Sequence, residues 1–180
     1  VVFGRASGLF IENALREGID MRDASQTDIE QGMSRLRRLD EAKGTEKFPD
    51  LRKELQNVMQ NHFGVFRKGE FMQEGIRKLA DLRGRIEGAA LTDRSNTFNT
   101  ARIEALELQN LLEVAEATAI TAEERKESRG AHARDDFQER DDENWLCHSM
   151  YYPEGKRVGK RAVNFKPRTV PTFEPKARTY

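Results

Sequence analysis

The residues best suited to chemistry lie between Glu127 and Trp145, where three arginines and one histidine alternate with carboxylates around a single glycine. Arginine presents a planar fork of N–H donors that matches a carboxylate, and Gly130 permits a turn that other residues resist. Arg129, His132 and Arg134 therefore have two alternative roles. They either support a ligand site from behind or form an inter-domain clamp.

We favour the inter-domain clamp, because networks of ionic side chains are often structural. In this role the three side chains satisfy buried carbonyls and pair with nearby acids, namely Asp135, Asp141 or Asp142. The cluster sits at the junction between a helical region and a proline-rich tail. We therefore expect Arg129 to find its partner in another domain and to have no obvious partner within this chain.

No other group of residues predicts a catalytic, cofactor or metal site. The three histidines, His62, His132 and His148, lack a second ligand three or four residues away, so no metal is expected. Cys147 is next to His148, but neighbouring residues in a strand point to opposite faces, which favours an inert, half-buried cysteine. The first eight residues contain Gly4 and Gly8 but no dinucleotide-binding motif, and we expect both glycines to allow close packing of another backbone.

Composition narrows the class of protein. The chain has 180 residues with 31 basic and 31 acidic side chains, so no net field attracts nucleic acid. A single cysteine cannot form an internal disulfide, which fits a reducing compartment. No apolar run approaches the roughly 20 residues that span a bilayer. The chain begins with Val1 and has no signal-peptide pattern, which suggests a fragment of a longer protein.

Apolar spacing predicts a mainly α-helical protein. Glycines and capping residues set the expected boundaries: Ser25 begins one helix through a capping box, and Pro49 suits the first turn of another. The expected helices span residues 1–17, 25–42, 49 to about 69, 70–88 and 96–126. We expect the run after Pro49 to include Phe66 and to break at Gly69.

The longest predicted helix carries alanine and leucine along one stripe, which favours a central position in an antiparallel, three-helix, spectrin-repeat-like bundle. Leu108 and Leu112 lie on this stripe and are assigned to the core. A second apolar line on the same helix predicts contact on another side; its members are Ile103, Leu111, Val114 and Ile120.

Four of the five prolines lie after residue 150, which excludes a long helix there. We expect an irregular, partly extended proline-rich C-terminal tail, with extended pieces at residues 145–152 and 162–166. The predicted domains are a remnant helix at residues 1–20, a helical bundle at 21–128, and the clamp segment with its tail at 129–180.

Several of these stretches resemble the C-terminal part of the succinate dehydrogenase flavoprotein subunit, a member of the succinate dehydrogenase and fumarate reductase flavoprotein family. The resemblance covers nearly the whole chain. Its most specific motifs are VVFGRA at residues 1–6, FNTARIEALE at 98–107, ESRGAHAR at 127–134, RDDENW at 140–145, and the terminal Arg178-Thr-Tyr180. The residues of the last two motifs look most like those of a bacterial succinate dehydrogenase.

The resemblance implies a parent enzyme that oxidises succinate to fumarate through FAD and passes electrons to an iron–sulfur subunit and quinone. It implies that the helix at residues 1–20 is a remnant from the end of the flavin domain, and that the partners are the flavin domain of the same chain and the iron–sulfur subunit. It also implies a position on the cytoplasmic face of the bacterial inner membrane, with attachment only through partner subunits. The family's catalytic and flavin-binding motifs have no counterpart between Val1 and Tyr180. We therefore expect no catalytic residue and no bound FAD here. The alternatives are a fumarate reductase flavoprotein, an L-aspartate oxidase, or a free-standing helical adaptor.

Overall fold

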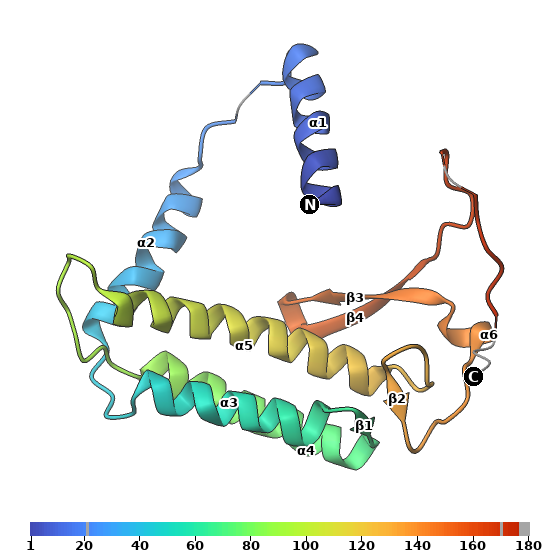
Figure 1. The fold of residues 1–180 in the computed structure, drawn as a ribbon. Coiled ribbons are helices and arrows are strands. Elements are labelled where there is room, and N and C mark those ends of the chain that lie inside the picture. The colour runs from blue at the N-terminus through green and yellow to red at the C-terminus, as the bar shows by residue number, and fades with distance from the viewer. Residues whose placement is uncertain (21, 170, 177–180) are drawn as a thin grey trace. The chain divides into compact units, whose positions relative to one another are not determined.

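The protein is described by a computed structural model that covers residues 1–20, 22–169 and 171–176 (Figure 1). The predicted tail motif at Arg178 to Tyr180 lies outside these residues. Contacts divide the chain into two compact units, residues 1–38 and residues 39–180, and each unit is described by itself. None of the helices in the described ranges is long and apolar enough to cross a membrane.

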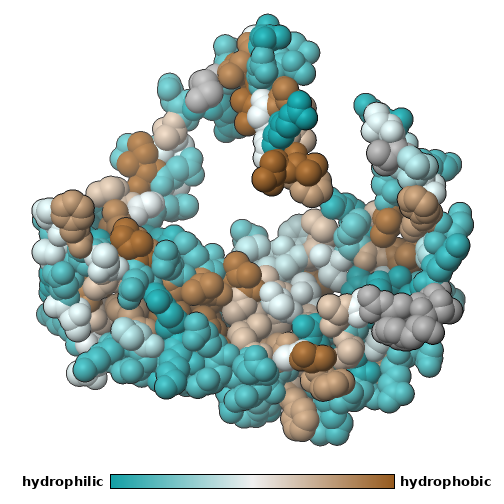
Figure 2. Space-filling view, in the orientation of Figure 1, coloured by the Kyte–Doolittle hydropathy of each residue, from teal (hydrophilic) through white to brown (hydrophobic). Residues whose placement is uncertain are grey.

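The first unit contains α1 (Val2–Arg16) and most of α2 (Gln26–Glu41). Gly18, with a φ of 82°, follows the end of α1, where a left-handed residue is expected. The large apolar side chains of α1 are exposed, among them Phe3, Leu9, Phe10, Ile11 and Leu15. Figure 2 shows apolar surface over this helix in brown. The Asp28 amide donates to Ser25 Oγ at 3.1 Å, which confirms the predicted helix start.

Three long helices form the second unit: α3 (Phe48–Phe63), α4 (Gly69–Gly88) and α5 (Thr100–Glu124). Each helix packs against the other two, and α4 runs opposite to both neighbours, as the colours of Figure 1 show. Their apolar stripes meet in one core in which Leu108 and Leu112 are 0% and 2% exposed. The sequence prediction for these two leucines is confirmed.

The end of α3 differs from the prediction. The helix stops at Phe63, because Gly64 has an extended backbone, and Phe66 and Arg67 form the short strand β1 (Phe66–Arg67). Phe66 is 77% exposed, so it does not contact the core even though it continues the helical spacing of apolar residues. The chain turns tightly here, and a Cβ at Gly75 of α4 would lie 2.4 Å from the ring of Phe63. Glycine is required there for the close approach of the two helices.

The start of α5 and its second apolar line also differ from the prediction. Asn99 caps the helix by accepting from the Arg102 amide at 2.8 Å, so α5 begins later than residue 96. Three members of the second line are exposed and Ile120 is half-buried, while α5 makes its additional contacts with the strands at residues 147–152 and 157–162. The exposed fractions are 56% for Ile103, 49% for Leu111 and 65% for Val114.

The remaining chain forms two small sheets. Strand β1 pairs in parallel with β2 (Ala133–Arg134), and after the single-turn helix α6 (Asp142–Trp145), β3 (Cys147–Tyr152) pairs antiparallel with β4 (Arg157–Ala162). A 3-10 turn (Glu154–Lys156) joins β3 to β4. The second extended piece was predicted at residues 162–166, but Ala162 is the last residue of β4, where it pairs with Cys147, and residues 163–166 have no partner strand.

Candidate functional site

The predicted clamp residues converge at one end of the second unit, between the end of α5 and the start of α4. A turn at Gly130, with a φ of 60°, lets Arg129 and His132 exchange two backbone hydrogen bonds. Ser128 anchors this turn, because its Oγ accepts from the Arg134 amide at 2.8 Å and donates to the Phe137 carbonyl at 2.8 Å. The structure therefore brings together the three residues that the sequence singled out.

Arg134 is only 2% exposed and lies at the C-terminal end of α5. Its Nη1 atom donates to the carbonyl of Glu123 at 2.9 Å and to those of Ala122 and Arg125 at 3.3 Å each. These carbonyls have no partner within the helix and carry the negative end of its dipole. A buried guanidinium at this position thus neutralises and caps α5.

Asp136 is the negatively charged partner of Arg134 in this arrangement. It accepts from Arg134 Nε at 2.7 Å and from Nη2 at 2.8 Å, and its Oδ2 also accepts from the Gly69 amide at 2.9 Å, at the start of α4. The hydrogen bonds from Arg134 hold the pKa of Asp136 well below its usual range. The sequence analysis proposed Asp135, Asp141 or Asp142 as acids for the clamp. Asp136, the true partner of Arg134, was missed.

Glu127 is the second residue that the sequence analysis missed. It is 0% exposed, and it accepts from Arg129 Nε at 2.8 Å, Arg129 Nη2 at 3.0 Å and the Asp141 amide at 2.8 Å, with Arg125 as a further donor. Burial alone raises the pKa of this carboxyl, but the hydrogen bonds from Arg129, Asp141 and Arg125 lower it below its ordinary value. The available signal was an acid directly before the arginine-rich turn.

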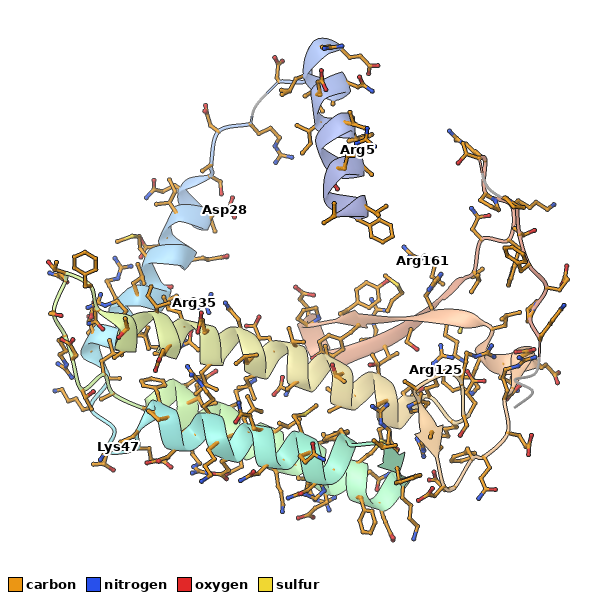
Figure 3. All side chains as sticks on the ribbon, in the orientation of Figure 1. Arg5, Asp28, Arg35, Lys47, Arg125 and Arg161 are labelled. Carbon is orange, nitrogen blue, oxygen red and sulfur yellow. The ribbon has the colours of Figure 1, made fainter. Side chains whose placement is uncertain are left out.

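Arg129 therefore has partners within this chain. Besides Glu127, it contacts Asp142 through Nη2 at 2.6 Å. The expectation that Arg129 lacks an internal partner is wrong, because the segment folds back so that α6 meets the turn. The pairing with Asp142 was among those expected for the clamp. Arg125, labelled in Figure 3, lies at the same junction and donates to the carbonyls of Trp145 and Cys147.

His132 is held in its neutral form. Its Nδ1 faces Arg67 Nη1 at 2.7 Å and its Nε2 faces the Arg125 carbonyl at 3.0 Å, so the proton is assigned to Nε2. Burial is the main cause that lowers the pKa of His132, and the charges of Arg67, Arg134 and Arg125 add to it, against the hydrogen bond to the carbonyl of Arg125. A neutral histidine in this position links β1 to the end of α5.

A second buried ion cluster fastens the β3–β4 hairpin to the helices. Glu116 of α5 is 4% exposed and accepts from Arg83 of α4 at 2.9 and 2.7 Å, and Lys156 reaches it at 3.3 Å. Burial opposes ionisation of Glu116, but the bonds from Arg83 and the charge of Lys156 give a net lowering of its pKa. The hairpin is thus joined to two helices at once.

The other residues considered from the sequence form none of the ion pairs found within the described ranges. Cys147 is half-buried and His148 is exposed on β3. Gly4 and Gly8 would meet nothing within 4 Å in their own unit if they carried a Cβ. In the described ranges, no three His, Cys, Asp or Glu side chains are placed to hold a metal ion. The geometry at the clamp joins helix ends to the C-terminal segment.

Comparison with known proteins identifies relatives of the whole chain. Residues 52–180 match the family model described as fumarate reductase flavoprotein C-term. The chain is 47% identical to the succinate dehydrogenase flavoprotein subunit of Coxiella burnetii over 178 residues, which are 99% of this chain and 30% of that protein. The mitochondrial subunit of Oryza sativa subsp. japonica is 39% identical and matches 100% of this chain with 29% of its own length.

Solved structures show the same fold. A quinol-fumarate reductase superposes with a TM-score of 0.79 at 35% identity, over 95% of this chain and 30% of that one. The Sdh1 complex of Mycobacterium smegmatis superposes with a TM-score of 0.75 at 30% identity, over 96% of this chain and 29% of that one. The chain therefore spans about 30% of the length of the curated relatives that it matches.

Proposed function

Because this chain belongs to the succinate dehydrogenase and fumarate reductase flavoprotein family, we propose that it is the C-terminal helical domain of a succinate dehydrogenase flavoprotein subunit. The whole subunit oxidises succinate to fumarate through FAD and passes electrons to an iron–sulfur subunit and on to quinone. The observation that carries this proposal is the 47% identity with a succinate dehydrogenase subunit over 99% of the chain.

Within such an enzyme, the chain has a structural and interaction role. Its buried ionic residues pair with one another: Glu127 with Arg129, Asp136 with Arg134, and Glu116 with Arg83. These pairs position helix ends, which supports a structural role for the cluster. Flavin and substrate then belong to the remaining part of the subunit, and this chain binds no FAD itself.

The clamp keeps its inter-domain role in this proposal, in a modified form. Arg129, His132 and Arg134 set the shape of the junction internally, and the junction then docks against the flavin domain. The Arg129 side chain is 28% exposed, so it can contact a neighbouring domain while paired with Glu127. Support for the flavin site through this surface is the second role consistent with the same contacts.

We assign residues 1–20 to the end of the flavin domain, 21–128 to a three-helix, spectrin-repeat-like bundle, and 129–180 to the clamp segment and its extended proline-rich tail. The antiparallel order of α3, α4 and α5 supports the bundle type. The iron–sulfur subunit is the proposed partner of the tail. The complex sits at the cytoplasmic face of the bacterial inner membrane, and this subunit reaches the membrane through its partners.

The test is to purify the full-length protein that contains this chain and to measure bound flavin and succinate-dependent dye reduction. Flavin-dependent succinate oxidation is expected, and a full-length protein without flavin would overturn the proposal. Fumarate reductase is the second candidate, because the flavoprotein subunit of Haemophilus influenzae fumarate reductase is 34% identical over 185 residues. The ratio of succinate oxidation to fumarate reduction separates the two.

A further inference from the structure

The second unit contains a groove beside the clamp that none of the roles above uses. It lies between the last turns of α5, the strand β1 and the start of β3, and has a volume of about 360 Å³. We call it the Arg67 groove. The polar side chains that matter for its chemistry are Arg67, Arg125, His132, His148 and Ser149.

The cations of this region differ in how they are neutralised. Arg125 pairs with Glu127 and Arg134 pairs with Asp136. Arg67 instead donates to the carbonyls of Phe63 and Gly64 and faces the neutral ring of His132, and no carboxylate of the described chain forms an ion pair with it. The carbonyls at the end of α3 offset only part of a full charge. The groove thus holds a half-buried guanidinium without a counter-ion.

Arg67 also has unused donors. A guanidinium has five N–H groups; Nε makes one hydrogen bond, and Nη1 and Nη2 make one each. One N–H therefore remains on each terminal nitrogen, and these two donors, called here the Arg67 fork, can give an oxyanion two hydrogen bonds. Ser149 Oγ accepts from Arg125 at 3.3 Å, so its own hydroxyl proton is available to a ligand.

We propose that the Arg67 groove binds one small oxyanion, a carboxylate or a phosphate group, through the Arg67 fork and the Ser149 hydroxyl. The exposed ring of His148 on β3 also lines the groove. Burial and the charge of Arg134 lower the pKa of Arg67, which agrees with a cation that lacks a carboxylate. An anion bound in the groove would neutralise the charge of Arg67.

The oxyanion has two possible sources, which are a free ion and a carboxylate side chain from another part of the full-length protein. The inference does not depend on the proposed enzymatic activity. The first experiment titrates the 180-residue chain with inorganic phosphate and with acetate at constant ionic strength, and follows backbone amide shifts. Saturable binding with shifts around Arg67 and Ser149 is expected. Absence of saturable binding of both anions overturns the proposal.

Variants show whether the groove is responsible. Arg67→Met should weaken anion binding at least about tenfold, as expected for loss of a charge-assisted pair, and Arg67→Lys and Ser149→Ala should weaken it less. The matched control is Arg77→Met, since Arg77 is an exposed arginine on α4 that pairs with Glu74. If Arg67→Met fails to fold, the affinities of Ser149→Ala and Arg67→Lys show whether the groove binds the anion. Unchanged affinity in the folded variants overturns the assignment.

The source is decided by repeating the phosphate titration on the full-length protein and its Arg67→Lys variant. Arg67-dependent binding with similar affinity in both lengths indicates a free ion. Binding to the 180-residue chain alone indicates that a carboxylate of the longer protein already occupies the groove. Both results support the oxyanion site, while phosphate binding that is independent of Arg67 in both lengths contradicts it.

Discussion

The guanidinium of Arg134 and the carboxylate of Asp136 form a two-bond ion pair, at 2.7 and 2.8 Å, that joins the end of α5 to the start of α4. Each partner also caps the helix end of opposite polarity: Arg134 binds the last carbonyls of α5, and Asp136 binds the Gly69 amide. The charges thus complement both helix dipoles while neutralising each other.

The first prediction concerns this pair. Arg134→Met should lower the free energy of unfolding by about 3–5 kcal/mol, because it leaves Asp136 without its cation and the α5 carbonyls without a donor. Urea unfolding followed by circular dichroism measures the change. The control, Arg77→Met on the surface of α4, should stay within about 0.5 kcal/mol of the wild type. Equal effects of the two changes would contradict the capping role.

The second prediction revises the expected effect of removing Arg129. Arg129→Ala should destabilise the 180-residue chain by about 1–3 kcal/mol, because the buried Glu127 loses two donors. Adding Glu127→Gln in the same chain should recover part of the loss, since a neutral amide needs no cation. A double-mutant cycle from urea unfolding checks the coupling. A chain whose stability does not respond to Arg129→Ala would return Arg129 to a purely inter-domain role.

The third prediction tests the register of α5 in the core. Leu108→Ala and Leu112→Ala should each cost about 2–5 kcal/mol, because both side chains are buried. Leu111→Ala is the matched control: the residue type is the same, but the side chain is 49% exposed. Its effect should stay within about 0.5 kcal/mol in thermal or urea unfolding. Similar costs for Leu111 and Leu112 would refute the register.

The fourth prediction is a pH dependence from His132. Its pKa is lower in the folded chain, so the unfolded chain binds more protons in this range and folding is favoured as pH rises. This contribution is complete above the unfolded pKa of about 6.5 and is lost as pH falls toward the folded pKa. The urea midpoint should therefore decline below about pH 6.5. His132→Gln should flatten this decline, whereas His148→Gln, at an exposed position, should keep it.

The fifth prediction separates the chain from its parent enzyme. The purified 180-residue chain should contain no flavin and should not reduce a dye with succinate, because its ionic residues serve the junction between helices and tail. Absorbance near the flavin bands and a dye assay measure this directly. The full-length protein is the positive control. Flavin that remains bound to the chain after purification would place part of the cofactor site within it.

Local sequence was sufficient to predict the presence of the helices and the core position of Leu108 and Leu112, but not the end of α3 or the start of α5. The capping serine at position 25, the proline at 49 and the alanine-leucine stripe around Leu108 act within one or two turns, so they can be recognised without knowledge of the fold. The family was recognised in the same way, because its motifs are continuous stretches. The glycine turn and the arginines of the clamp also lie in one continuous stretch, so they too could be recognised in the sequence.

The tertiary structure decided which residues complete the clamp. Asp136 and Glu127 lie among many acids of similar type, and only the return of the chain against α4, α5 and α6 selects them. The same folding back supplies the partners of Arg129, and it pairs Phe66, beyond the end of α3, with Ala133 of β2. Both acids lie only two residues from their arginines. The groups that hold these pairs in place are more distant in sequence, namely the Gly69 amide, the last carbonyls of α5 and the Asp141 amide, so those contacts follow from the packing of the helices and not from spacing along the chain.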